Sequence, residues 1–304
     1  MLRVIAVLGK ISLRHPNIVC RCLSSCTGES GLVFRPLLEP THIAKLDSPS
    51  PADFSSEVLG RDSDSGDAKL YPRIVTGLTK NWPASRKWST IGSLLSERTA
   101  HLSVPVELGK KNVGYNIDAS MTYTGETEAL GAPSWQRTDI RFDLFVQLLE
   151  SGRLEEEGLV AYLSQVSIDE IPPLEEDVQL PLPHTPQLAA NPNLWIGSKG
   201  TYTPIHRDIL GHNLLFQLLG TKHVRLYPPT QYSRLYISTD PFLRNTSLIP
   251  FDHSFDRSRW PLFGEVDEWY ECIIGPGDAL FMPKGWYHSV WALEKSISVN
   301  SWFL

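Results

Sequence analysis

Residues 275–288 read Gly-Pro-Gly-Asp-Ala-Leu-Phe-Met-Pro-Lys-Gly-Trp-Tyr-His, and this stretch decides the fold class. Apolar runs lie on both sides of Pro283 and Gly285, which predicts a strand, a tight turn and a second strand. Proline cannot donate a hydrogen bond to a sheet, so Pro283 belongs in the turn. His288 is therefore expected on the second strand, where its side chain has a fixed direction.

A second candidate strand contains His206-Arg207-Asp208. Side chains two positions apart on a strand point to the same face, so His206 and Asp208 can bind one ion. A His-x-Asp tripeptide also arises by chance. On this evidence alone, His206 would be interpreted as an ordinary surface or core histidine. His288 follows Asp208 by 80 residues, with several short strand patterns between them. That arrangement predicts a barrel or jelly roll in which strands distant in sequence close one site.

Two imidazoles and one carboxylate are a ligand set that suits a non-haem Fe(II) oxygenase. Three protein ligands leave three positions open on an octahedral ion. A 2-oxo acid can occupy two of these positions and dioxygen the third. A structural zinc site would instead take four protein ligands, usually including cysteine. The triad therefore indicates a redox enzyme.

Five ordered blocks carry a resemblance to a known family. They resemble the JmjC-domain 2-oxoglutarate oxygenases, and most closely their small protein-hydroxylase branch. The resemblance covers about Leu159 to Phe303 and implies a mainly β fold, the double-stranded β-helix (jelly roll) of the cupin class, with a helical N-terminal lobe. Upstream, residues 73–77 and 81–84 extend it. The blocks are Leu194-Trp195-Ile196-Gly197 leading into Thr203-Pro204-Ile205-His206-Arg207-Asp208, then Asn213 to Lys222, Arg225 to Pro229, Gly275 to His288, and Ser298 to Phe303.

The resemblance implies roles for individual residues, with no catalytic side chain beyond the metal ligands. Aromatic walls and a carboxylate together could bind a guanidinium group by stacking and paired hydrogen bonds. The implied iron ligands are His206, Asp208 and His288; the implied 2-oxoglutarate contacts are Lys222, Tyr162, Thr203, Asn213 and Asn300; the implied substrate contacts are Trp195, Trp302 and Glu107.

Two of these positions, Lys222 and Glu107, have an alternative interpretation. Lys222 alone could be a solvated lysine in a Gly-Thr-Lys hairpin, although a dicarboxylate would give a buried lysine its partner. Glu107 could be an ordinary exposed strand residue. From His206 to Lys222 the chain has one residue more than expected from the nearest relatives, and the extra residue falls within 209–212. His212 is interpreted as a loop histidine rather than a fourth ligand.

The expected activity is hydroxylation of a protein side chain, with Fe(II), 2-oxoglutarate and O2 as requirements and succinate and CO2 as products. Demethylation of methyl-lysine and hydroxylation of a tRNA base, both known in similar proteins, are the alternatives within the family. The alternative in which the chain is not an enzyme is a non-catalytic JmjC binding module. Retention of the three ligands together with Lys222 argues against that module.

The amino-acid composition argues against nucleic acid and membrane as binding partners of this chain. The 304 residues are 41% hydrophobic, enough for one enzyme domain and an additional lobe. The net charge of −6 and the absence of a basic face make a nucleic acid a poor partner. No apolar run reaches the roughly 18 residues of a membrane span. Cys20, Cys22, Cys26 and Cys272 are interpreted as reduced thiols.

The domain organisation is expected to have three parts. Residues 1–30 are basic, lack acidic residues before Glu29 and are amphipathic, which favours a mitochondrial transit peptide over a disordered tail of a cytoplasmic or nuclear protein. Residues 31–157 form the lobe, with a loop insert near 46–69, and residues 158–304 form the double-stranded β-helix. Helices are expected at 90–97 and 141–151. We expect a monomer, since Leu304 directly follows the last matched strand.

Overall fold

The computed structural model describes residues 40–47, 54, 58, 70–111, 135–180, 188, 190–240, 245–253 and 255–303. All of them belong to one compact unit, Phe34–Leu304. The expected targeting segment (1–30) and most of the expected insert (46–69) lie outside the described residues. No helix in the described part of the chain is long and apolar enough to cross a membrane.

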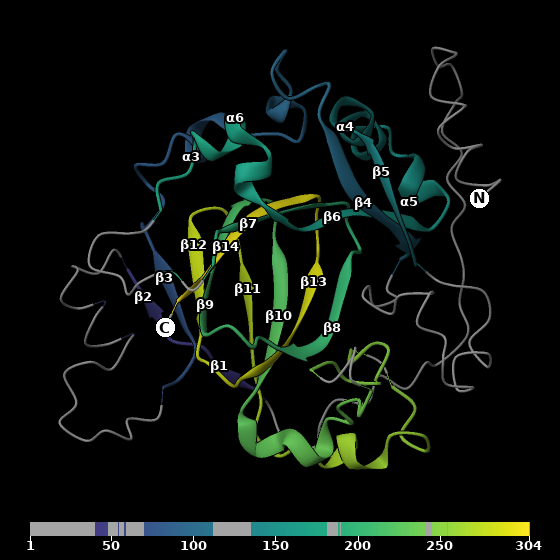
Figure 1. The fold of residues 1–304 in the computed structure, drawn as a ribbon. Coiled ribbons are helices and arrows are strands. Elements are labelled where there is room, and N and C mark those ends of the chain that lie inside the picture. The colour runs from purple at the N-terminus through teal and green to yellow at the C-terminus, as the bar shows by residue number, and fades with distance from the viewer. Residues whose placement is uncertain are drawn as a thin grey trace, which may run out of the picture. The chain divides into compact units, whose positions relative to one another are not determined.

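Two β-sheets form the framework, as the mainly β jelly-roll prediction requires (Figure 1). Neighbouring strands are antiparallel except for the pairs β1–β11 and β2–β3. The five-stranded sheet has the order β1 (Thr41–His42), β11 (Tyr270–Ile274), β10 (Lys222–Tyr227), β13 (Tyr287–Ala292), β8 (Tyr202–Arg207). The nine-stranded sheet has the order β2 (Lys45–Leu46), β3 (Arg73–Thr76), β12 (Asp278–Met282), β9 (His212–Leu219), β14 (Ser296–Phe303), β7 (Asn193–Gly197), β6 (Leu159–Ser167), β4 (Ser103–Lys110), β5 (Trp135–Arg141).

An apolar core lies between the sheets. Val224 and Leu226 of β10 pack against Leu215 of β9 and Leu280 of β12, all almost completely buried. Alternate residues of each strand face this core, which leaves the other faces for different partners. The strands β4 and β5 of the lobe extend the nine-stranded sheet through the β4–β6 pairing.

The helices are short and lie mainly at one end of the sheets (Figure 1). The expected helix at 141–151 is present, because Phe142, Phe145, Val146 and Leu149 form a buried stripe at helical spacing. The helices are α3 (Ala84–Lys87), α4 (Phe142–Glu150), α5 (Arg153–Glu156) and α6 (Pro172–Glu175), with 3-10 turns η2 (Gly92–Leu94), η5 (Ile168–Glu170), η6 (Pro229–Arg234) and η7 (Pro261–Glu265).

The prediction of a helix at 90–97 was wrong, since only the single turn η2 forms there. The hydroxyl of Thr90 accepts a hydrogen bond from the Ser93 backbone, and the Ser93 hydroxyl accepts one from the Thr90 backbone. Farther on, Thr99 Oγ1 accepts the backbone N–H of Ser96. Hydroxyl side chains that bind the local backbone in this way compete with a continuous helix.

The junction before Lys222 is not a hairpin. Strand β9 ends at Leu219 in the nine-stranded sheet, and Lys222 begins β10 in the five-stranded sheet, so Gly220 and Thr221 cross between sheets. Gly220 has φ +70°, and a Cβ there would lie 2.1 Å from the Lys295 carbonyl oxygen. The crossing directs Lys222 toward the interior.

The described residues of the segment 228–269 (228–240, 245–253 and 255–269) cover the outer face of the five-stranded sheet, with Tyr227, Trp269 and Phe263 in one buried cluster. At its centre the buried Asp252 accepts hydrogen bonds from Tyr202 Oη (2.8 Å), Tyr227 Oη (2.7 Å) and Ser289 Oγ (2.7 Å). These three donors come from β8, β10 and β13. One carboxylate therefore ties the covering segment to three neighbouring strands.

Candidate active site

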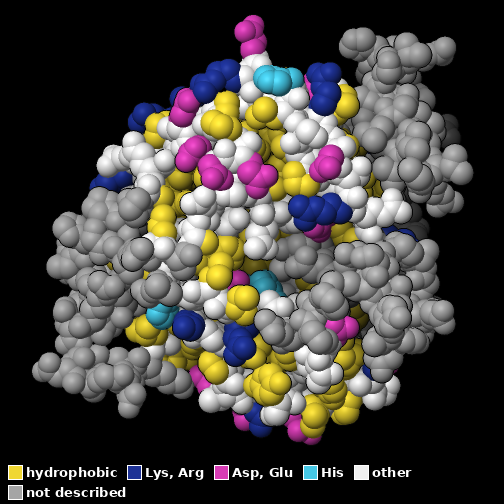
Figure 2. Space-filling view, in the orientation of Figure 1, with side chains coloured by type: hydrophobic (Ala, Val, Ile, Leu, Met, Phe, Trp, Pro, Cys, Tyr) yellow, Lys and Arg dark blue, Asp and Glu magenta, His cyan; other side chains and the backbone are white. Residues whose placement is uncertain are grey.

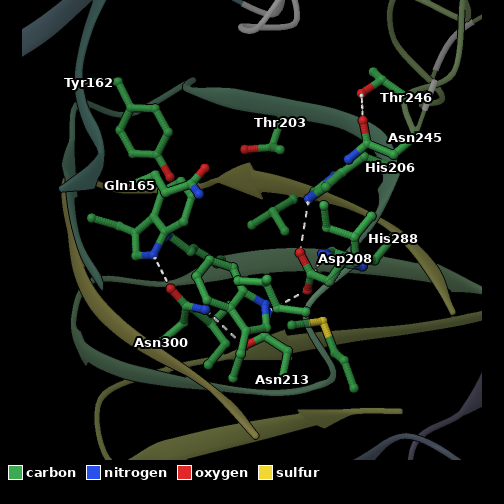
Figure 3. Close-up of a pocket in the computed structure, with 18 residues that line it drawn as sticks. Tyr162, Gln165, Thr203, His206, Asp208, Asn213, Asn245, Thr246, His288 and Asn300 are labelled. Atoms are coloured by element: carbon green, nitrogen blue, oxygen red, sulfur yellow. Dashed lines mark hydrogen bonds and ion pairs between the residues drawn. The ribbon is translucent and has the colours of Figure 1, made fainter. Parts of the chain in front are cut away.

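The three predicted metal ligands meet at one point. Their ligand atoms lie within 4.8 Å of one another (Figure 3). His206 is on β8 and Asp208 lies one residue beyond that strand, while His288 is on β13, directly opposite His206 in the antiparallel ladder. His206 Nε2 is 4.0 Å from Asp208 Oδ1, and His288 Nε2 is 3.8 Å from Asp208 Oδ2. This spacing suits three ligands on one face of an ion.

Neighbouring groups orient the ligands. His206 Nδ1 is 2.9 Å from the carbonyl oxygen of Pro204, which leaves Nε2 with a lone pair for a metal. Burial, followed by the nearby His206, lowers the pKa of His288 to about 4. Burial alone would raise the pKa of Asp208, but the two histidines and the Asn213 amide hold it below its usual value. Neutral imidazoles and an ionised carboxylate are the forms that bind metal.

A cavity of about 240 Å³ opens beside the triad. Lys222 lines it and is only 2% exposed. No hydrogen bond or ion pair to its ammonium group is present among the described residues. Burial lowers the pKa of Lys222 to about 7. A buried ammonium group facing a cavity is stabilised by an anion, so the cavity fits a carboxylate ligand.

The predicted hydroxyl donors Tyr162 and Thr203 both line this cavity, and their side chains hydrogen-bond to each other. Burial raises the pKa of Tyr162, so this phenol stays protonated and can donate. Figure 3 shows both on the side of the cavity away from Asn213.

The predicted amides Asn213 and Asn300 belong to one chain of hydrogen bonds. Trp195 Nε1 donates to Asn300 Oδ1 (2.7 Å), Asn300 Nδ2 donates to Asn213 Oδ1 (3.1 Å), and Asn213 Nδ2 donates to Asp208 Oδ2 (2.7 Å). Each link fixes the orientation of the next amide. The chain connects the aromatic wall to a metal ligand (Figure 3).

The three predicted substrate contacts are placed differently. Trp195 and Trp302 line the cavity, whereas Glu107 does not. The Glu107 carboxylate accepts a hydrogen bond from Ser164 (3.0 Å) and lies 3.6 Å from Arg137. It sits beside Tyr162 in the β4–β6 ladder. Its role toward a substrate stays a prediction.

Several other residues that line the cavity were not predicted from the sequence. Gln165 lies at a register shift in β6 and has φ +51°. Asn245 and Thr246 come from the long segment after β10, and Ile209 and Leu210 follow Asp208. A strand irregularity or a loop that folds back cannot be read from periodicity, which is why these residues were missed.

His212 is not a fourth ligand. It begins strand β9 rather than lying in a loop, and its ring stacks on Phe281 at 5.6 Å. Its Nδ1 accepts the backbone N–H of Lys284 at 3.1 Å. The extra residue therefore belongs to the loop 209–211.

A two-sheet β-sandwich that holds a His-Asp-His triad is the architecture of the cupin-like proteins. The sequence profile of the cupin-like domain matches residues 68–304, so the chain belongs to the cupin-like domain family, within its JmjC-domain group.

Three relatives illustrate the similarity. JmjC domain-containing protein F of Dictyostelium discoideum is 30% identical over 274 residues, covering 77% of this chain and 57% of that protein. Lysine-specific demethylase 8 of Danio rerio is 32% identical over 276 residues, covering 88% and 60%. Lysine-specific demethylase JMJ30 of Arabidopsis thaliana is 29% identical over 236 residues, covering 76% and 49%. The chain thus spans about half the length of the relatives it matches.

Proposed function

We propose that the chain is an Fe(II)- and 2-oxoglutarate-dependent dioxygenase that hydroxylates a protein side chain. The observation that supports this most strongly is that one cavity holds both the His-Asp-His triad and Lys222, whose ammonium group has no hydrogen bond or ion pair to any described residue. The triad offers the N2O donor set of a non-haem Fe(II) site. Lys222 offers a charge for the far carboxylate of a dicarboxylate.

The residues divide the work as follows. His206, Asp208 and His288 would hold Fe(II), and Lys222 would bind the distal carboxylate of 2-oxoglutarate with donors from Tyr162 and Thr203. Bound together with O2, iron and 2-oxoglutarate supply oxygen transfer: one oxygen atom enters succinate, the other enters the substrate, and CO2 leaves. The chain of amides from Trp195 holds Asp208 in place, and the buried walls exclude water.

Turnover tests this proposal directly. Purified protein supplied with Fe(II), 2-oxoglutarate and O2 should release succinate above a metal-free blank, measured by mass spectrometry. His206→Ala should abolish release while the far-ultraviolet circular dichroism is retained. Succinate release by wild type and variant alike would contradict the iron assignment. No release and no Fe(II) binding by the wild type would favour a non-catalytic binding module.

Demethylation of methyl-lysine is the second candidate, because two of the relatives above are named lysine-specific demethylases. Both reactions insert oxygen at a C–H bond, and an N-methyl product then loses formaldehyde. Protein captured from cell extract by a metal-substituted enzyme distinguishes them after turnover. Gain of one oxygen atom supports hydroxylation, and loss of one methyl group supports demethylation.

A tRNA base is less well supported as the substrate. The net charge is −6, and Figure 2 shows acidic and basic side chains interspersed over the face drawn. Nucleic-acid binding ordinarily relies on a concentrated group of Lys and Arg side chains. A protein substrate therefore remains the proposal.

A further inference from the structure

The segment 245–247 runs along β8, an edge strand of the five-stranded sheet. It forms an antiparallel bridge between Thr246 and the ligand His206. On either side of the bridge, Ser247 N donates to Ile205 O (2.7 Å) and Arg207 N donates to Asn245 O (2.9 Å). The part of β8 that presents the first ligand is thus paired on both edges.

Asn245 bonds twice to the residue that separates two ligands. In addition to the backbone bond, Asn245 Nδ2 donates to the carbonyl oxygen of Arg207 (3.1 Å). Both backbone polar groups of Arg207 therefore bond to Asn245. Because Arg207 lies between His206 and Asp208, its backbone angles set the separation of those two ligands. Figure 3 shows Asn245 and Thr246 next to His206.

The chain after Asp208 offers little comparable restraint. Ile209 is 63% exposed and Leu210 is 40% exposed, so this loop is only loosely packed. Among the described residues on that side, Asn213 and Trp302 contact the Asp208 carboxylate, and these contacts hold the side chain rather than the backbone. The backbone position of Asp208 consequently depends on Arg207.

The segment 245–247 is itself held firmly. Its outer edge bonds to 236–238, with Ser238 N to Thr246 O at 2.8 Å and Leu248 N to Tyr236 O at 2.9 Å. Tyr236 has φ +50°, a strained value for a non-glycine residue. Its ring packs on Trp260 at 4.9 Å and its hydroxyl accepts Leu262 N at 3.0 Å. Strain of this kind persists only where the surroundings impose one geometry.

We propose that Asn245 is a positioning residue for the metal centre: its side chain fixes the Arg207 peptide and so holds His206 and Asp208 at the separation that the metal requires. The inference rests on the proposed function, because it assumes that this triad binds a divalent ion. It assigns a role to a loop residue outside the ligand set.

Cobalt(II) binding tests the role without requiring a substrate. Apoprotein is titrated with Co(II), and affinity and the visible d–d spectrum are recorded for wild type and Asn245→Ala. Loss of the hydrogen bond to the Arg207 peptide is expected to weaken Co(II) binding by about 10-fold, the lower end of the effect of removing a group bonded directly to a ligand, and to change the d–d spectrum. Thermal unfolding of the apoprotein should shift little, since the lost hydrogen bond is at the surface.

Two further variants make the result specific. Asn245→Leu keeps a similar side-chain volume, adds no charge to the cavity and cannot donate to Arg207, so it should reproduce the loss. Asn191→Ala removes another exposed asparagine hydrogen bond, that from Asn191 Nδ2 to Asp169, and should leave Co(II) binding unchanged.

Wild-type affinity and an unchanged spectrum in Asn245→Ala and Asn245→Leu would overturn the inference and leave the proposed function standing. An equal loss in Asn191→Ala would also overturn it. Failure of the wild type to bind Co(II) at all would instead contradict the proposed function, and the inference with it.

Discussion

At the residue scale, the hydrogen-bond chain from Trp195 to Asp208 leaves no freedom to the amides within it. Asn300 is 1% exposed, so its oxygen has no alternative donor in bulk water if Trp195 Nε1 is lost. An unsatisfied buried acceptor costs about 1–3 kcal/mol. Trp195, which is proposed to contact the substrate, is thus coupled through hydrogen bonds to the proposed metal ligand Asp208.

Trp195→Phe should lower the free energy of unfolding by about 1–3 kcal/mol, measured by urea titration, because it removes the donor to Asn300. Trp291→Phe is the matched control. Trp291 Nε1 is buried and has no hydrogen-bond partner among the described residues, so the same substitution removes no bond there. Equal losses in the two variants would contradict the importance of the hydrogen bond.

Lys222 gives the site a pH dependence. Its pKa without a bound anion is about 7, and a bound carboxylate raises it, so binding of 2-oxoglutarate takes up a proton above that pH. The affinity should therefore fall as pH rises above about 7, measured by calorimetry with the metal-loaded protein. Lys222→Met should bind weakly at every pH. A pH-independent wild-type affinity from pH 7 upward would rule out the ammonium as the anchor.

At the scale of elements, the crossing from β9 to β10 delivers Lys222 to the cavity. Gly220→Ala should destabilise the fold by more than the roughly 1–2 kcal/mol that a left-handed alanine costs, since the added Cβ meets the Lys295 carbonyl oxygen. Gly152 has a similar φ of +73° but nothing within 4 Å of an added Cβ. Gly152→Ala therefore isolates the backbone strain, and equal unfolding midpoints for the two variants would contradict the close contact.

The covering segment 228–269 depends on Asp252. Burial would raise the pKa of Asp252, but His253, Arg225 and the Tyr227 hydroxyl outweigh it and hold the pKa well below the usual value. Because the folded pKa is below the unfolded value of about 3.9, the stabilisation is complete above that pH and is lost as the pH falls below it. Asp252→Asn should cost roughly 3 kcal/mol at pH 7 and reduce the acid sensitivity.

The exposed Asp256 supplies the comparison for Asp252. Asp256→Asn should leave the free energy of unfolding at pH 7 almost unchanged, as expected for an exposed side chain. Chemical denaturation at pH 7 and at about pH 2.5, below the unfolded pKa of about 3.9, measures both variants. If Asp252→Asn were as stable as Asp256→Asn at pH 7, the carboxylate would not be the tie between β8, β10 and β13.

The helices and strands that could be predicted from the sequence are those in which the spacing of apolar residues matches the spacing of buried positions. The strands around Pro283 and the helix 142–150 have regular apolar spacing, and they form as predicted. The turn at 92–94 does not follow its pattern because hydroxyl side chains bind the local backbone. The crossing at Gly220 and the partner of β8 at 245–247 depend on pairings between distant segments, which no local pattern specifies.

At the scale of the whole molecule, the proposed location depends on residues outside the described part of the chain. We propose that residues 1–30 direct import into mitochondria, from their basic and acid-poor composition. A fusion of these residues to a fluorescent protein should colocalise with a mitochondrial marker. Replacement of Arg3, Lys10, Arg14 and Arg21 by glutamine should abolish import, and diffuse fluorescence of the unmodified fusion would contradict the proposal.

The two sheets bring ligands 80 residues apart in sequence onto neighbouring strands and place Lys222 in the same cavity. The central claim is that this cavity binds Fe(II) and 2-oxoglutarate together. Anaerobic addition of both to the apoprotein, followed by visible absorption, tests it without a known substrate. We predict the charge-transfer band of chelated 2-oxoglutarate in the wild type and its loss in His206→Ala. A wild type without the band, or a band that persists in His206→Ala, would contradict the account.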